Sequence, residues 1–138
     1  MSIAKKVVNE MIVNDEFSKW LGIKVLVVGE GNCVLQMKVR KEMTNGFNTA
    51  HGGITYALAD SALAFAANTY GVKSVSIETS ISHTKKVLAG DVLNCFTKEI
   101  NRSKKTAIYY VIIKNQDDIE VAHFKGTVYI TDKKWFNY

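Results

Sequence analysis

Residues 51–67 read HGGITYALADSALAFAA, and this stretch decides the fold. It is apolar on nearly every side of a helix, which is typical of a helix buried inside a protein. Asp60 is the only Asp, Glu, Lys or Arg between Glu42 and Lys73. Burying an unpaired carboxylate costs on the order of several kcal/mol. A functional role would explain the residue; the structural alternative is that Asp60 faces solvent at a gap in the sheet or hydrogen-bonds Thr55, Tyr56 or Ser61.

The start of the predicted helix is His51-Gly52-Gly53. The first N–H groups of a helix have no partner within it and carry the positive end of its dipole, so they can hold a developing oxyanion. Glycine has no Cβ, which lets a substrate carbonyl approach the backbone. The alternative is that the two glycines only form a flexible turn before the helix. Asp60 lies seven residues beyond Gly53, roughly 10 Å further along the helix axis. The two groups could converge across a dimer interface.

The segments around this helix predict an α+β fold. Two short helices are expected before the sheet, one capped by Ser2 and one running from the cap Asn14 to Gly22. Residues 23–40 alternate as a hairpin with one buried face, and residues 43–53 form an irregular loop. Four strand-like segments follow, at 72–87, 91–100, 106–115 and 119–131. Their short connections predict antiparallel neighbours in a six-stranded sheet that covers the helix.

Composition limits the class of protein. A chain of 138 residues is expected to form one domain, residues 1–138, with a helical segment at 1–22. Its N-terminus has neither a signal-peptide pattern nor a membrane span. Cys33 and Cys95 are far apart and lie in apolar stretches, which fits a cytoplasmic location. The net charge is +5, but the basic residues are scattered in short groups, so a small phosphorylated ligand is favoured over nucleic acid.

The motif that spans residues 45–68 resembles the PaaI-like acyl-CoA thioesterases, a branch of the hotdog superfamily associated with phenylacetate degradation. The resembling pattern is N-G-x4-H-G-G-x4-L-A-D-x-A-x-A-x-A-x-N. Similar features recur at 75–78, 89–91 and 124–126, so the resemblance covers roughly residues 20–131. It implies a hotdog fold, in which a long antiparallel sheet wraps one central helix. It also implies a homodimer with active sites at the interface, and commonly a homotetramer.

The resemblance further implies the roles of five residues in hydrolysis of an acyl- or aryl-CoA thioester. The Gly52 amide would polarise the thioester carbonyl, and Asp60 of the partner subunit would serve as general base or nucleophile. Asn45 and His51 would shape the site, His51 without transferring a proton. Ser76 resembles a residue that positions water. By its own sequence context Asn45 is a turn residue, because it precedes a glycine.

Further residues are expected to contact the substrate. Gly53 lies beside the carbonyl, and an acyl pocket would be lined by Phe47, Tyr56 and Phe65. The coenzyme A phosphates would be held by cations in one of two groups, Arg102, Lys104 and Lys105, or Lys85 and Lys86. No pair of histidines or cysteines has metal-ligand spacing, so neither a metal nor a cofactor is expected beyond the coenzyme A of the substrate.

Two other functions compete with the thioesterase. A hotdog enoyl-CoA hydratase or dehydratase would use a histidine and an acid as a proton-transferring pair, and His51 and Asp60 supply those residue types. The loop motifs that such enzymes carry are absent from the chain. A non-catalytic acyl-CoA-binding module could also use the fold, but the lone carboxylate argues against it.

Overall fold

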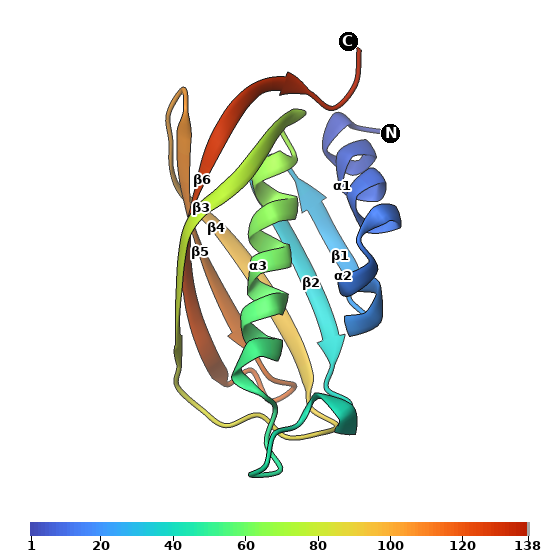
Figure 1. The fold of residues 1–138 in the computed structure, drawn as a ribbon, viewed down its shortest axis with the longest axis vertical. Coiled ribbons are helices and arrows are strands. Elements are labelled where there is room, and N and C mark those ends of the chain that lie inside the picture. The colour runs from blue at the N-terminus through green and yellow to red at the C-terminus, as the bar shows by residue number, and fades with distance from the viewer. Residues whose placement is uncertain (138) are drawn as a thin grey trace.

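The computed structural model describes residues 1–137, in which a six-stranded antiparallel sheet curves around one long helix (Figure 1). Two helices, α1 and α2, come first and lie beside the β1–β2 side of the sheet. The elements are α1 (Ile3–Asn14), α2 (Glu16–Leu21), β1 (Lys24–Gly29), β2 (Asn32–Lys38), the short 3-10 helix η1 (Lys41–Met43), α3 (Gly52–Asn68), β3 (Val72–His83), β4 (Val92–Arg102), β5 (Thr106–Lys114) and β6 (Glu120–Lys134). The predicted α+β class with one central helix is confirmed.

The order of the strands differs from the prediction at one point. The sheet runs β1-β2-β4-β5-β6-β3, so β3 and β4 follow each other in the chain but are not neighbours. The connection between them, residues 84–91, does not turn back on itself. It is tied instead to the loop before α3 and to the end of β2, because Ala50 N donates to the Val87 carbonyl at 2.7 Å and Gly90 N donates to the Val39 carbonyl at 2.7 Å. The strand β3 therefore ends at His83 and lies at the edge of the sheet, paired with β6.

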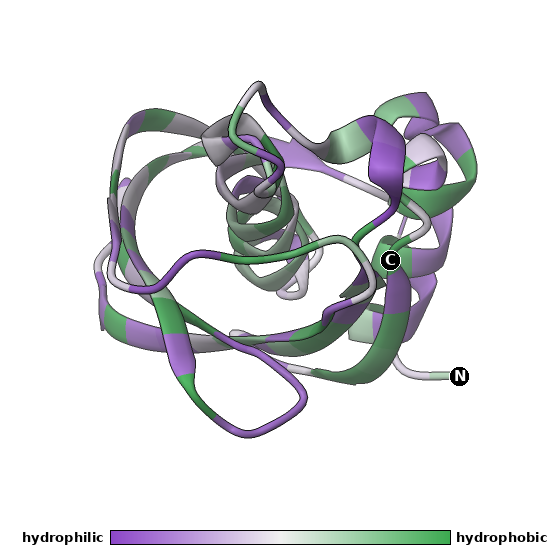
Figure 2. Ribbon diagram, turned by 90° about the horizontal axis from the view of Figure 1, so that it is seen from below, coloured by the Kyte–Doolittle hydropathy of each residue, from purple (hydrophilic) through white to green (hydrophobic). Residues whose placement is uncertain are grey.

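The helix α3 fills the hollow of the sheet, as the end-on view in Figure 2 shows. Its sheet-facing side chains are fully buried, and among them is Phe65. Gly126 on β6 allows this close packing, since a Cβ at that position would lie 2.4 Å from a methyl group of Leu63. The interior continues into the N-terminal helices through Val8 and Leu21. Within residues 1–137 the structure contains no helix long and apolar enough to span a membrane.

The N-terminal helices begin and end nearly as predicted. The Ser2 hydroxyl accepts a hydrogen bond from Lys5 N, and Gly22 ends α2 in the left-handed conformation with φ 75°. The cap of α2 is Asp15 rather than the predicted Asn14. Asn14 is still the last residue of α1, and its side chain donates to the Glu10 carbonyl.

Candidate active site

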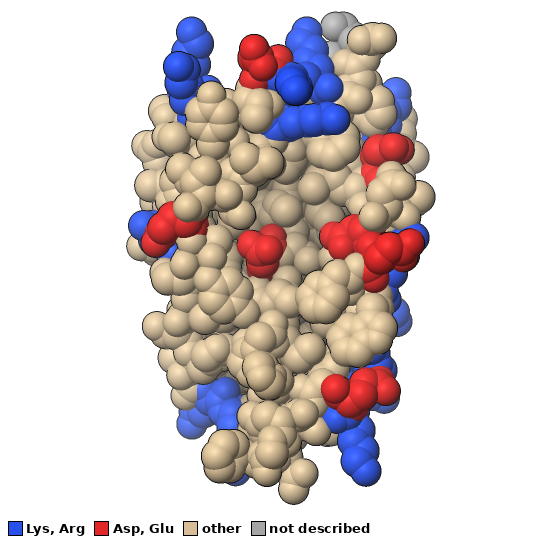
Figure 3. All heavy atoms as spheres, viewed as in Figure 1, with Lys and Arg blue, Asp and Glu red and all other residues tan. Residues whose placement is uncertain are grey.

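Asp60 lies on the side of α3 that faces away from the sheet. Its side chain is exposed, so the sheet does not cover this side of the helix, and the alternative of a solvent-facing residue describes the single subunit. Figure 3 shows a single acidic group over the middle of α3, surrounded by uncharged atoms, and Asp60 is the only charged residue of that helix. Among the described residues 1–137 its carboxylate has no hydrogen-bond or ion-pair partner. Thr55, Tyr56 and Ser61 all bond elsewhere.

Two effects raise the pKa of the Asp60 carboxyl above its usual range. The larger is desolvation by the groups around it, and the smaller is repulsion by the negative charge of Asp15. Asp15 is held in place because its carboxylate accepts hydrogen bonds from the amide and the hydroxyl of Ser18 at 2.9 and 2.6 Å. The Ser18 hydroxyl lies 2.8 Å from that of Ser61, the residue next to Asp60. The Asp60 carboxylate is therefore partly desolvated although it remains accessible to solvent.

A groove of about 440 Å³ opens beside Asp60. Ser76 of β3 lines the same groove, so the structure brings these two predicted site residues together. Most of the other lining groups are apolar, and they come from α1, α3, β3, β6 and the segment after β6. They are Met11, Leu63, Ala64, Asn68, Lys73, Ser74, Val75, Val128 and Trp135.

The start of α3 presents a free backbone donor. His51 is the N-cap, and its Nδ1 accepts a hydrogen bond from Gly53 N at 2.9 Å. His51 thus orients the backbone at the start of α3. The N–H of Gly52 has no hydrogen-bond partner within the part of the chain that the structure describes. Of the two glycine amides, Gly52 is the one available to a substrate oxygen.

A second hollow adjoins Gly52 and contains a residue that sequence reasoning did not assign to the site. His83, at the end of β3, would lie 3.3 Å from a Cβ added to Gly52, and its Nδ1 is 3.2 Å from Thr55 Oγ1. Lys85 and Lys86 line the same hollow. Of the two groups of cations predicted for the coenzyme A phosphates, this one lies beside the helix start. The sequence alone does not show that these lysines lie near the start of α3, because their position depends on the path of residues 84–91 past the helix.

Asn45 organises the loop before the helix. Its side-chain oxygen accepts hydrogen bonds from Phe47 N at 2.9 Å and from the amide and hydroxyl of Thr49 at 3.3 and 3.2 Å. Its turn role is therefore present in the structure, and its side-chain amide hydrogens remain available as donors.

Two of the three aromatic residues predicted to line an acyl pocket point elsewhere. Phe65 has no exposed surface and belongs to the core, which corrects that prediction. Tyr56 faces the sheet, where its hydroxyl bonds Thr79 and its ring meets Phe124 edge-on at 5.6 Å. Phe47 is 87% exposed on its loop. The groove beside Asp60 is lined by other apolar residues, because α3 turns Phe65 toward the sheet and not toward Asp60.

The other predicted cations lie at the opposite end of α3. The Arg102 guanidinium stacks on Tyr70, 3.7 Å from the ring centroid, and the Tyr70 hydroxyl donates to Glu99 at 2.6 Å. This places Arg102 in a partly buried cluster within its own chain rather than at a solvated turn. Lys104 and Lys105 are exposed in the turn between β4 and β5.

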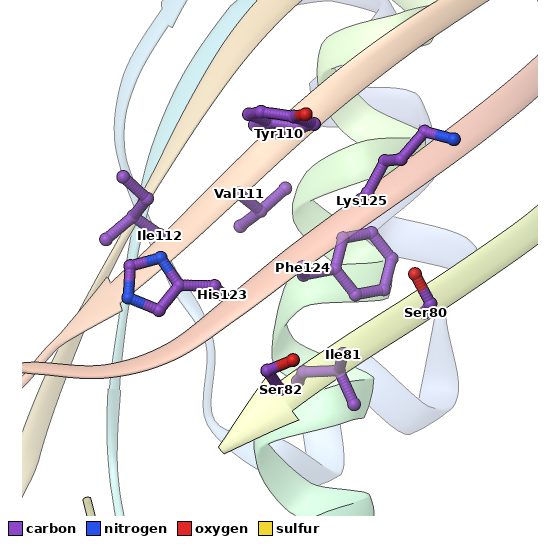
Figure 4. A pocket seen from close by; sticks show the side chains of 9 residues that line it. All are labelled: Ser80, Ile81, Ser82, Tyr110, Val111, Ile112, His123, Phe124 and Lys125. Carbon is purple, nitrogen blue, oxygen red and sulfur yellow. The ribbon is translucent and has the colours of Figure 1, made fainter. Parts of the chain in front are cut away.

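A further hollow lies on the convex side of the sheet. It spans β3, β5 and β6, and in the close view of Figure 4 the helix lies behind these strands. Ser80, Tyr110, His123 and Lys125 are among its lining residues. No residue predicted for the active site lines it, so it is separate from the Asp60 groove. The residues described in the structure contain no cluster of three or more His, Cys, Asp or Glu side chains that could hold a metal ion.

Comparison with known proteins relates this geometry to enzymes. Residues 47–122 match the family model of the thioesterase superfamily. The acyl-coenzyme A thioesterase PaaI of Escherichia coli is 36% identical over 116 residues, which is 84% of this chain and 83% of the relative. A putative esterase of Archaeoglobus fulgidus is 38% identical over 127 residues, 92% of this chain and 82% of the relative. The solved structure of E. coli PaaI superposes with a TM-score of 0.93 at 32% identity, covering 96% of both chains.

Proposed function

Because the chain belongs to the thioesterase superfamily and is a PaaI-like hotdog thioesterase, we propose that it hydrolyses acyl- or aryl-CoA thioesters with Asp60 as catalytic carboxylate and the Gly52 amide as oxyanion donor. One observation carries the assignment of residues. The chain keeps an unpaired carboxylate in an apolar groove and an unpaired N–H at the start of the same helix. These are the two groups that thioester hydrolysis requires.

The chemistry needs little else. Asp60 accepts a proton from water as the hydroxide oxygen attacks the thioester carbon, and Ser76 positions that water. The carbonyl oxygen becomes an oxyanion held by Gly52 N–H. When the C–S bond breaks, the electron pair leaves with sulfur, and a thiol of pKa about 8.5 departs as thiolate without a strong acid. A second route has Asp60 attack the carbon directly, which gives a mixed anhydride that water then opens.

The relatives and the charges near Gly52 support a coenzyme A thioester as the substrate class. The E. coli relative comes from the phenylacetic acid degradation operon, so aryl thioesters such as phenylacetyl-CoA are the first to test. Lys85 and Lys86 are exposed beside the helix start. We expect them to bind phosphates of coenzyme A through charge-assisted hydrogen bonds. Arg102 is engaged with Tyr70 and is the weaker candidate.

Two subunits are needed to complete the site. Gly52 and Asp60 are eight residues apart on one helix, roughly 12 Å along its axis, too far to grip one carbonyl. The strand β3 pairs with β6 on one edge, and its other edge has no partner strand within residues 1–137. Val75 and Ile77 on β3 are 55% and 59% exposed. Antiparallel pairing of two β3 edges would make a homodimer in which Gly52 faces Asp60 of the partner, and two such dimers a tetramer.

Complementation between two inactive variants tests this arrangement. Asp60→Asn and Gly52→Pro chains, each with its own affinity tag, are co-expressed and assayed for thiol release from acyl-CoA. Random pairing makes about half of the dimers mixed, and each mixed dimer has one intact site of two, so about a quarter of wild-type activity returns. If each site lay within one chain, mixing would restore nothing. Each variant prepared alone is the control.

The acid limb of the pH–rate profile should move when Asp15 loses its charge. Asp60 acts as a carboxylate, so activity rises as pH passes its pKa, which desolvation and Asp15 raise. Asp15→Asn removes the repulsion and lowers that pKa, and the limb shifts to lower pH. An asparagine can still cap α2. Glu16→Gln, which removes a neighbouring charge, is the matched control, and an equal shift in both variants would contradict the assignment.

A further inference from the structure

The Asp60 groove runs along one face of α3. Asp60, Ala64 and Asn68 are spaced four residues apart, so they lie along one face of the helix. The span from Asp60 to Asn68 is roughly 12 Å along the axis. Leu63 and Ala64 line the groove between them, β3 contributes Ser74 to Ser76, and α1 contributes Met11. An apolar trough therefore leads from the carboxylate toward the C-terminal end of α3.

Trp135 stands at that end and is held on three sides. Its indole N–H donates to the side-chain oxygen of Asn68 at 2.9 Å, and its backbone N–H donates to the Gly71 carbonyl at 3.0 Å. The ammonium of Lys73 lies 4.9 Å from the centroid of the ring. The first turn of α1 and the last part of β6 lie near this part of the molecule, as Figure 1 shows. The segment after β6 thus brings a large aromatic side chain to the groove.

Asn68 joins the tryptophan to both sides of the groove. It is 1% exposed, and its side-chain nitrogen donates to the carbonyls of Ala64 on α3 and Ser74 on β3 at 2.7 and 3.1 Å. Its oxygen accepts from Ser74 N as well as from Trp135. A buried amide with this many partners fixes the ring relative to Asp60. The end of the groove is therefore formed by a side chain that is fixed in position by hydrogen bonds.

We propose that Trp135, together with Met11, closes the acyl end of the Asp60 groove and sets the size of the acyl group that the enzyme accepts. The inference rests on the proposed function, since it assigns a specificity-determining role within that site. A carbonyl held beside Asp60 directs its substituent along the apolar trough, because the polar coenzyme A arm leaves toward solvent. A substituent longer than the trough meets the indole ring. Compact acyl groups, including aryl groups, fit in front of it.

Trp135→Ala should relax the size limit. Measured by thiol release, its ratio of kcat/KM for palmitoyl-CoA over butanoyl-CoA is expected to rise roughly tenfold or more relative to wild type, the scale of a change of a few methylene groups in an apolar pocket. Trp135→Phe keeps a ring without the indole hydrogen bond and should retain the wild-type ratio. Trp20→Ala is the matched control, because Trp20 is 49% exposed and lies on α2 outside the groove. An unchanged ratio in folded Trp135→Ala overturns the proposal.

A second variant decides the matter if Trp135→Ala does not fold. Met11→Trp adds bulk to the groove wall, so kcat/KM for palmitoyl-CoA and for phenylacetyl-CoA should each fall at least tenfold relative to kcat/KM for acetyl-CoA. If turnover of all three thioesters changes by the same factor relative to wild type, the inference is wrong. Failure of the proposed function looks different, because Asp60→Asn would then still hydrolyse every thioester. An inactive Asp60→Asn beside unaltered chain-length profiles refutes only the role of Trp135 and Met11.

Discussion

Asp60→Asn is expected to fold and to bind acyl-CoA while thioester hydrolysis falls on the order of a thousandfold, the scale of a lost general base. An amide can neither take a proton from water nor attack the carbonyl. The variant should be at least as stable as wild type at neutral pH. Because the folded state raises the pKa of Asp60, the charged form destabilises the fold above that pKa, and the difference disappears below the pKa of the unfolded chain.

The measurement combines thiol release with acyl-CoA binding by calorimetry and with thermal unfolding at neutral and acidic pH. Glu78→Gln is the matched control, since Glu78 is an exposed acid on β3 that pairs with Lys125 at 3.9 Å. It should keep near-normal turnover. Substantial hydrolysis by folded Asp60→Asn would remove the carboxylate from the mechanism.

Gly52→Pro should lower kcat by about 10²–10³-fold, the loss measured when an oxyanion donor is removed elsewhere. Gly52 is the first residue of α3, a position that favours proline because its N–H has no use within a helix. His51 precedes it with φ −60° and ψ 136°, an extended conformation that a following proline permits. The substitution thus deletes one hydrogen-bond donor and leaves the helix intact.

Gly52→Ala separates the donor from the space around it. Alanine keeps the N–H but adds a Cβ 3.3 Å from His83 Nε2, as proline also does. If the donor matters, the alanine variant is markedly more active than the proline variant in thiol-release assays, with similar melting temperatures. Equal activity of the two would mean that crowding by Cβ, not the missing N–H, accounts for the loss.

Local patterns in the sequence were enough to find most elements of the fold and the centre of the site. The strand β2 follows from alternation in the sequence, with Cys33, Leu35 and Met37 buried as a period of two requires. Asp60 and Gly52 stood out for reasons of charge and backbone chemistry that need no tertiary information. The unpaired N–H of Gly52 fits its predicted role as oxyanion donor.

Contacts between segments that are far apart in the sequence could not be predicted from local patterns. The placement of β3 beside β6 depends on a connection whose hydrogen bonds go to the loop before α3, and nothing in its length reveals that. Phe65 was expected to line an acyl pocket but belongs to the core, because helix phase alone cannot say which face meets the sheet. Trp135, which no sequence pattern assigned to the site, lines the groove instead. The apolar pattern of α3 predicts a helix buried on nearly all sides, whereas the side that carries Asp60 is open to solvent.

The contact between Gly126 and Leu63 also restricts how this sequence can change over evolutionary time. Any side chain at position 126 would push a methyl-sized group into Leu63, and the helix that yields would carry Asp60 with it. Replacement of the glycine therefore requires the Leu63 side chain to shift or to become smaller. Substitutions at these two positions, which lie on different elements and are not chemically reactive, are expected to be coupled.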